Sequence, residues 1–348
     1  MTVEKKRIQF IDLAKGICIL QIVILHCLQP LEKDIPVLEF LGYLRMPLYF
    51  CLSGLFYKDY GNVNFFFLKK INKILITFVG WFFIGYALLY TRNFIFSTPS
   101  PAENDITAIF YGNHFFNNPL WFLLSLFWCN IIFRIINEWS KIGLLQFSIV
   151  LFLTLIGIFM SFNGITNFLY LGTSLTCLPF FYMGYVLGSF FIFSDQNSVK
   201  RDFSLMCCGL AFITIMSFLP IQIPYLKYHL NSFTEGYIIL YYLFSSIMVI
   251  SVILMCKFIK KIPFISYLGK YSIIVLVTHI LIIYIANGCL TKFSFFEIYK
   301  EYLPVLDIFI VCLSMFLVIP ACRRFLPYIC AQKELIKARI EEKKLLAE

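Results

Sequence analysis

Three polar side chains in the first apolar run of the chain are of types that could do chemistry. Asp12, Lys15 and His26 lie in a segment that is otherwise almost entirely apolar. At about 100° per residue in a helix, Lys15 and His26 fall on one face, ~16 Å apart along the axis, and Asp12 lies one turn from Lys15. An imidazole can act as a general base or a nucleophile, and a polar stripe of this kind predicts the lining of a cavity.

A blander interpretation of the same stripe stays open. Asp12 and Lys15 could lie at the membrane interface, and His26 could be a hydrogen-bonded packing residue. The shared face favours the cavity, because a charge inside a span costs ~2.5–3.5 kcal/mol on insertion scales and requires an explanation.

The next apolar run contains a second group of candidates. Arg45 precedes a Met-Pro pair, and Pro47 is expected to kink a helix and free backbone carbonyls, which membrane proteins tolerate beside cavities. Ser53 is followed by glycine, and small residues permit helices to approach closely.

Lysines gather ahead of the third apolar run, at Lys69, Lys70 and Lys73. A solvated basic loop is the simplest interpretation of this cluster. A clamp for a phosphorylated cofactor is the alternative, because lysine commonly binds phosphate.

The remaining histidines differ in their signal. His279 follows Lys270 by nine residues, which places it near the middle of a span by helical rise, where it could be a packing or a functional residue. His114 and His229 fall in predicted outer loops and carry no intrinsic signal.

The composition identifies the elements that position these residues. Of 348 residues, 60% are hydrophobic and only 14% are charged, and the mean hydropathy is +0.84. A soluble domain has roughly 25% charged residues. The apolar residues come in long runs rather than in strand-like alternation, so we expect an all-α integral membrane protein.

A membrane-spanning helix needs about 20 apolar residues, and ten runs meet that length. We expect one transmembrane domain over residues 1–330 and a charged helical tail over 331–348. The predicted spans are Ile8–Leu28, Leu38–Phe56, Ile74–Tyr90, Leu120–Ile136, Leu144–Phe162, Phe168–Phe193, Phe203–Leu219, Tyr237–Cys256, Tyr271–Gly288 and Leu303–Cys322.

The charges predict the orientation of these spans. With the N-terminus inside, most of the 29 basic residues fall in cytoplasmic segments, so both termini are expected in the cytoplasm. The net charge of +10 then needs no nucleic-acid partner. The 12 cysteines lack metal-ligand spacing, and we expect small buried hydrophobes and no metal.

Several segments, taken in order, resemble the membrane-bound acyltransferase-3 family, which includes bacterial O-acetyltransferases of surface polysaccharides and fucose 4-O-acetylase-type proteins. The opening segment is similar to that family's signature of a basic residue and a histidine separated by ten residues, here Lys15 and His26. The resemblance covers essentially the whole chain and rests on residues 7–26, 46–54, 67–74, 119–123, 181–188 and 268–279.

The resemblance implies transfer of an acyl group, usually acetyl from acetyl-CoA at the cytoplasmic face. The implied acceptor is a hydroxyl of a surface polysaccharide or lipid-linked glycan, and the implied location is the bacterial inner membrane. The implied residues are catalytic His26, Asp12 and Lys15, cofactor-binding Lys15, Lys69, Lys70, Lys73 and Ser53, and candidate substrate-site Arg45, Trp121 and His279.

Two departures from the family pattern bear on these roles. Lysines stand where the family often has arginine, which removes bidentate phosphate contacts at those positions. Arg45 stands where many relatives have histidine before Met-Pro.

The mechanism and the class of protein leave alternatives. His26 could act as the base of a direct transfer, which we favour, or carry the acyl group covalently. A transporter or flippase of lipid-linked glycans would also have intramembrane charges and a kinked helix. A catalytically silent membrane interaction protein would not need His26.

Overall fold

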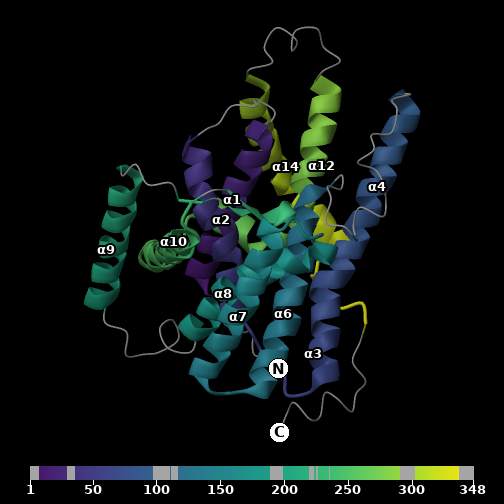
Figure 1. Ribbon diagram of the computed structural model, residues 1–348. Helices are drawn as coiled ribbons and strands as arrows, with labels where there is room; N and C mark the ends of the chain where they lie inside the picture. Colours follow the sequence, from purple (N-terminus) through teal and green to yellow (C-terminus); the bar gives the residue numbers. More distant parts are fainter. Residues whose placement is uncertain are drawn as a thin grey trace, which may run out of the picture.

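The computed structural model describes residues 8–29, 36–96, 110, 117–188, 199–218, 223–224, 226–234, 236–290 and 302–336 (Figure 1). Its described α-helices form one assembly with a two-stranded hairpin. They are α1 (Gln9–Leu28), α2 (Pro36–Leu55), α3 (Val63–Lys70), α4 (Ile76–Phe96), α6 (Trp121–Trp139), α7 (Gly143–Phe162), α8 (Leu171–Leu187), α9 (Val199–Phe218), α10 (Ile238–Ile259), α11 (Pro263–Lys270), α12 (Ser272–Leu290) and α14 (Leu303–Phe325).

The membrane-helix class is confirmed, whereas the count of ten spans is not. Within the described ranges, seven helices are long and apolar enough to cross a membrane, or eight if the bent pair α11 and α12 is one span. Each predicted span has a helix or a bent pair at its place, but α2 and α8 are not among the seven. The helix α8 is only 17 residues long. The cytoplasmic placement of both termini stays a prediction.

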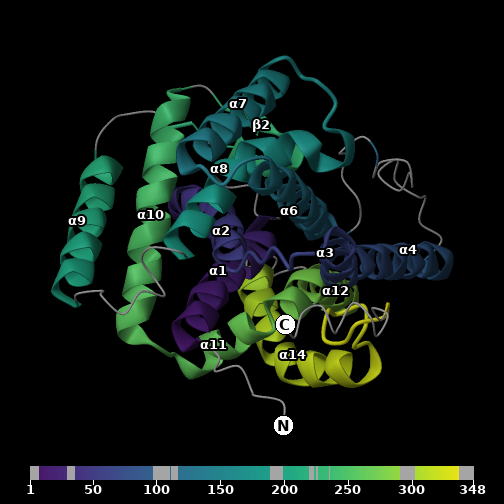
Figure 2. The same ribbon diagram turned by 90° about the horizontal axis from the view of Figure 1, so that it is seen from below.

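The helix α1 lies near the middle of the molecule and contacts α2, α10, α11, α12 and α14 (Figure 2). Its closest neighbour is α11, where two glycines allow the backbones to touch. A Cβ atom on Gly16 would overlap the carbonyl oxygen of Ile265, and one on Gly269 would overlap that of Asp12. Because small residues drive helix association in membranes, this crossing fixes the rotation of the polar stripe.

A second crossing of the same kind joins α2 to α8. A Cβ atom on Gly54 would overlap the carbonyl oxygen of Phe181, and one on Gly184 would overlap that of Cys51. The expectation that the small residues after Cys51 permit close approach is met at Gly54. This contact fixes the position of α2, the helix that carries Arg45, against α8.

The segment after α14 packs back onto the third apolar run. The side chain of Asn72 accepts hydrogen bonds from the backbone of Leu335 and Ile336, each at 2.9 Å, and Trp81 donates to the carbonyl of Ile329 at 3.0 Å. Residues 331–336 form turns and bends rather than the start of a helix. The rest of the predicted tail lies outside the described residues.

Candidate active site

A cavity of about 240 Å³ lies at the C-terminal end of α1. Its walls come from α1, α2, the start of α6, α12 and the hairpin segment after α9. The lining residues are Ile22, Leu25, His26, Gln29, Gly42, Arg45, Met46, Asn118, Pro119, Trp121, Phe122, Lys227, Tyr228, His229 and Leu276. We call this the outer cavity, after the side of the membrane on which the predicted topology puts the end of α1.

Two histidines face each other at the outer cavity. The ring centroids of His26 and His279 are 5.4 Å apart, with 42° between the ring planes. His279 is fully buried, and its Nδ1 donates to the carbonyl of Val275 at 2.8 Å. Since a carbonyl oxygen only accepts, Nε2 of His279 keeps its lone pair, and it has no hydrogen-bond partner within the described residues.

The tautomer of His26 follows from a neighbour on the same helix. Nδ1 of His26 lies 3.3 Å from Oε1 of Gln29, one turn further on. Because the amide oxygen accepts, Nδ1 carries the proton and Nε2 carries the lone pair. His26, which lines the outer cavity, therefore carries its basic lone pair on Nε2.

The bend between α11 and α12 brings the two histidines together. The two helices meet at 92° around Tyr271, so α11 can lie along the start of α1 while α12 runs beside its end. His279, which sequence analysis could not pair with any residue, thereby reaches His26.

Arg45 is buried on the α2 wall of the outer cavity, with 3% of its surface exposed. The thiol of Cys18 donates to its carbonyl oxygen at 2.7 Å, which ties this turn of α2 to α1. Pro47 lies inside α2, and as a proline it lacks the amide hydrogen that would bond to the preceding turn. Arg45 and His26 thus share one cavity.

Aromatic rings form another wall. Trp121 stacks on Tyr228 with ring centroids 5.9 Å apart and planes only 8° from parallel. The hydroxyl of Tyr228 is hydrogen-bonded to that of Tyr241. The predicted substrate-site residues Arg45 and Trp121 therefore lie at the same cavity as His26, and His279 lies against the His26 ring.

The segment that supplies Tyr228 was not singled out by its sequence. It comprises β1 (Leu226–Lys227), a 3₁₀ turn (Tyr228–Leu230) and β2 (Ser232–Phe233), and we call residues 226–233 the outer strap. It adds Lys227 and His229 to the cavity lining. In the sequence, these residues form only a short polar loop between two apolar runs. Such a loop does not indicate that its residues line a cavity.

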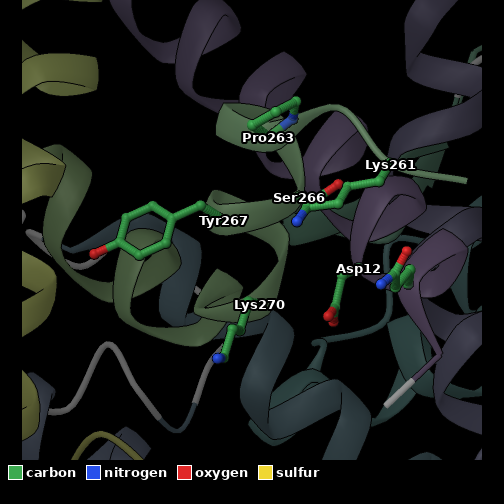
Figure 3. Close-up of a pocket in the computed structure, with 7 residues that line it drawn as sticks. Asp12, Lys261, Pro263, Ser266, Tyr267 and Lys270 are labelled. Carbon is green, nitrogen blue, oxygen red and sulfur yellow. The ribbon is translucent and has the colours of Figure 1, made fainter. Parts of the chain in front are cut away.

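A second cavity, of about 800 Å³, lies at the opposite end of α1, and we call it the inner cavity. Figure 3 shows Asp12 on α1 across from Ser266 and Lys270 on α11, with Lys261 on the connection before α11. The lining is completed by Gln9, Pro263 and Tyr267. Asp12 and His26 are ~21 Å apart along the helix axis, so one helix joins the two cavities.

The lysines predicted to bind a cofactor do not line the inner cavity. Lys15 lies with its Nζ 5.3 Å from the ring centroid of Phe56, just after α2. Lys70 lies over Tyr57 and Phe66, at 6.0 and 5.2 Å, so it reaches the same end of α2.

The other predicted cofactor residues are dispersed. Lys69 forms an ion pair with Glu334, and Lys73 is exposed. Ser53 donates to the carbonyl of Tyr49 at 2.8 Å, within its own helix. Within the described part of the chain, no three His, Cys, Asp or Glu residues are grouped so that they could hold a metal ion.

A family model described as an acyltransferase domain matches residues 8–324. No curated protein and no solved structure matches the chain. The match covers both cavities and all the helices that line them.

Proposed function

The chain belongs to this acyltransferase family, and we propose that it transfers an acetyl group from acetyl-CoA at the inner cavity to a glycan hydroxyl at the outer cavity. The observation that carries the proposal is the His26–His279 pair at one end of α1, with a second, larger cavity at the other end. This layout suits a donor and an acceptor that arrive from opposite faces of a membrane.

His26 acts as the general base in this proposal. Its Nε2 takes the proton of the acceptor hydroxyl while the hydroxyl oxygen attacks the thioester carbonyl carbon. The carbon–sulfur bond then breaks, and the departing CoA thiolate takes the proton from the imidazolium. His279 packs against the His26 ring from a position fixed by Val275, and it is a positioning residue.

The donor is held at the inner end of α1. Lys261 and Lys270 at the inner cavity supply the positive charge that CoA phosphates require, and Asp12 can accept hydrogen bonds from ribose or adenine groups. Lys15 and Lys70 form a second basic group at the end of α2. The pantetheine arm is long and thin enough to span the ~21 Å along α1 that separates Asp12 from His26.

The test is transfer of radiolabelled acetyl from acetyl-CoA to surface glycans in bacterial membranes that contain the chain. We expect His26→Ala to lower the rate by about 10²–10⁴-fold at unchanged protein level. Cys207→Ala on the exposed face of α9 is the control and should retain the wild-type rate. The absence of acetyl-CoA-dependent label with the wild type, or full activity without His26, would overturn the proposal.

A transporter or flippase of lipid-linked glycans predicts no dependence on acyl-CoA. No observation in the described residues favours it over acyl transfer, and family membership favours the enzyme.

A further inference from the structure

The charged residues of the outer cavity are all cationic. Arg45 and Lys227 line it together with His26 and His229, and the described lining contains no aspartate or glutamate. The inner cavity, in contrast, carries Asp12 beside its two lysines. On the premise of the proposed acyl transfer, we propose that the acceptor is an anionic sugar whose carboxylate or phosphate group is bound by Arg45 and Lys227.

Arg45 is placed for such recognition by its backbone. Its turn of α2 is tied to α1 through Cys18, and the α2–α8 crossing at Gly54 holds the helix from the other side. A buried guanidinium in an apolar helix is costly, and residues of this kind usually face a polar cavity. Its planar array of donors matches the two oxygens of a carboxylate or phosphate.

Lys227 is placed by the outer strap, which is anchored through buried polar groups. Thr173 on α8 donates to the carbonyl of Tyr228 at 2.5 Å, and Asn167 donates to the hydroxyl oxygen of Thr173 at 2.8 Å. Asn231 in turn donates to the carbonyl of Gly157 on α7 at 3.2 Å.

Thr173, Asn167 and Asn231 are each at most 5% exposed. Buried hydrogen bonds of this kind specify one conformation, because leaving any of these groups without a partner would be expensive. The strap therefore holds Lys227 and Tyr228 at a fixed place on the cavity wall.

The stacked pair Trp121 and Tyr228 supplies the remaining element of sugar recognition. The C–H face of a sugar ring packs against aromatic rings, while polar groups around the rim fix its orientation. Gln29 and Asn118 are such groups on the same cavity. A volume of about 240 Å³ lies below the ≈300–1,000 Å³ of drug-sized sites, so the cavity takes one sugar residue of a glycan.

The experiment compares three acceptors with the purified full-length protein and radiolabelled acetyl-CoA. They are a methyl glucuronoside with a carboxylate, methyl glucoside 6-phosphate with a phosphate, and neutral methyl glucoside. We expect kcat/KM for at least one anionic acceptor to exceed that for the neutral one by about tenfold or more, a preference that weakens as salt is raised. The two anionic arms decide between carboxylate and phosphate.

The matched variants are Lys227→Gln, Lys227→Arg and Lys200→Gln. Lys227→Gln should reduce the anionic-to-neutral ratio by roughly 5–10-fold, Lys227→Arg should keep it, and Lys200→Gln on α9 should not change it. Because Lys227 is exposed on the strap, its substitution leaves the fold intact, whereas Arg45→Gln alone could not separate binding from folding.

Quenching of tryptophan fluorescence by the same sugars without acetyl-CoA gives a readout that does not depend on catalysis. Anion-selective quenching without any acetyl transfer would overturn the proposed function and support the outer cavity only as a binding site for an anionic sugar. Acetyl transfer with equal use of neutral and anionic acceptors, and no effect of Lys227→Gln, would overturn the inference and leave the acyltransferase.

Discussion

The two ends of α1 differ in almost every property that matters for binding. The outer end has a cavity of about 240 Å³ lined by stacked aromatic rings, by cations and by His26, which packs against His279, and the anchored strap supplies part of this lining. The inner end has a cavity of about 800 Å³ whose lining carries charges of both signs, from Asp12, Lys261 and Lys270. A small, rigid site can discriminate among ligands, whereas a large one accommodates a bulky ligand. The proposed function assigns selection of the acceptor to the outer end and binding of the donor to the inner end, and this contrast supports that assignment.

The largest effect after loss of His26 is expected at its partner imidazole. His279→Ala should lower kcat by up to about 10²-fold with little change in KM for either substrate, because a misplaced base loses alignment rather than binding. His279→Asn, which can still donate to the carbonyl of Val275, should recover part of the rate. Steady-state kinetics with each substrate varied checks this.

Thr278→Val is the matched control for the His279 variants. Its hydroxyl bonds to the carbonyl of Ile274 within the same helix, so its loss perturbs α12 without touching the histidine pair. An equal fall in kcat for Thr278→Val and His279→Ala would mean that His279 acts only through packing. The outer cavity would then differ from the inner one in binding but not in catalysis.

Charge removal at the inner cavity should act on the donor alone. The double variant Lys261→Gln, Lys270→Gln is expected to raise KM for acetyl-CoA by about tenfold and to leave KM for the acceptor unchanged, because phosphate contacts are lost only at that end. Steady-state kinetics with the acetyl-CoA concentration varied at a fixed acceptor concentration, and the reverse, measure the two KM values.

The double variant Lys15→Gln, Lys70→Gln is the companion measurement for the donor end. If KM for acetyl-CoA rises more in this variant than in the Lys261, Lys270 variant, the CoA phosphates bind at the end of α2 rather than at the inner cavity. A change in acceptor KM with either pair would break the division of roles between the two ends.

The smallest effect is expected from loosening the outer strap. Thr173→Val removes the donor to Tyr228 and should lower the free energy of unfolding by about 1 kcal/mol while raising acceptor KM roughly 2–5-fold. Thermal unfolding and acceptor kinetics test this. Thr214→Val, on exposed α9, is the control, and an equal effect there would show that the strap does not shape the acceptor site.

Parts of the site could be predicted from local sequence because they lie within one helix. The spacing of Asp12, Lys15 and His26 depends only on helical geometry, and His26 does lie on a cavity wall. The structure assigns the other two to the opposite end, with Asp12 on the inner cavity and Lys15 beside Phe56. Helical phase from sequence gives a face but not the neighbour that covers it.

Contacts between distant segments could not be predicted in this way. Lys69 appeared to belong to a basic cluster, yet it pairs with Glu334, 265 residues further along the chain. Lys227 and His229 looked like ordinary loop residues, and it is the anchoring of the strap by Thr173 that brings them to the cavity. No local pattern encodes such contacts.

The sequence by itself determined that this is a helical membrane protein of an acyltransferase family, because apolar runs of membrane length and short motifs are local properties. Only the tertiary structure decided which residues meet. His279 reaches His26 because α11 and α12 meet at 92° and because Gly16 and Gly269 let α11 press against α1. The bend and the close crossing depend on backbone contact between helices some 250 residues apart in the chain. Hydropathy and residue spacing describe only neighbouring residues and cannot predict such a contact.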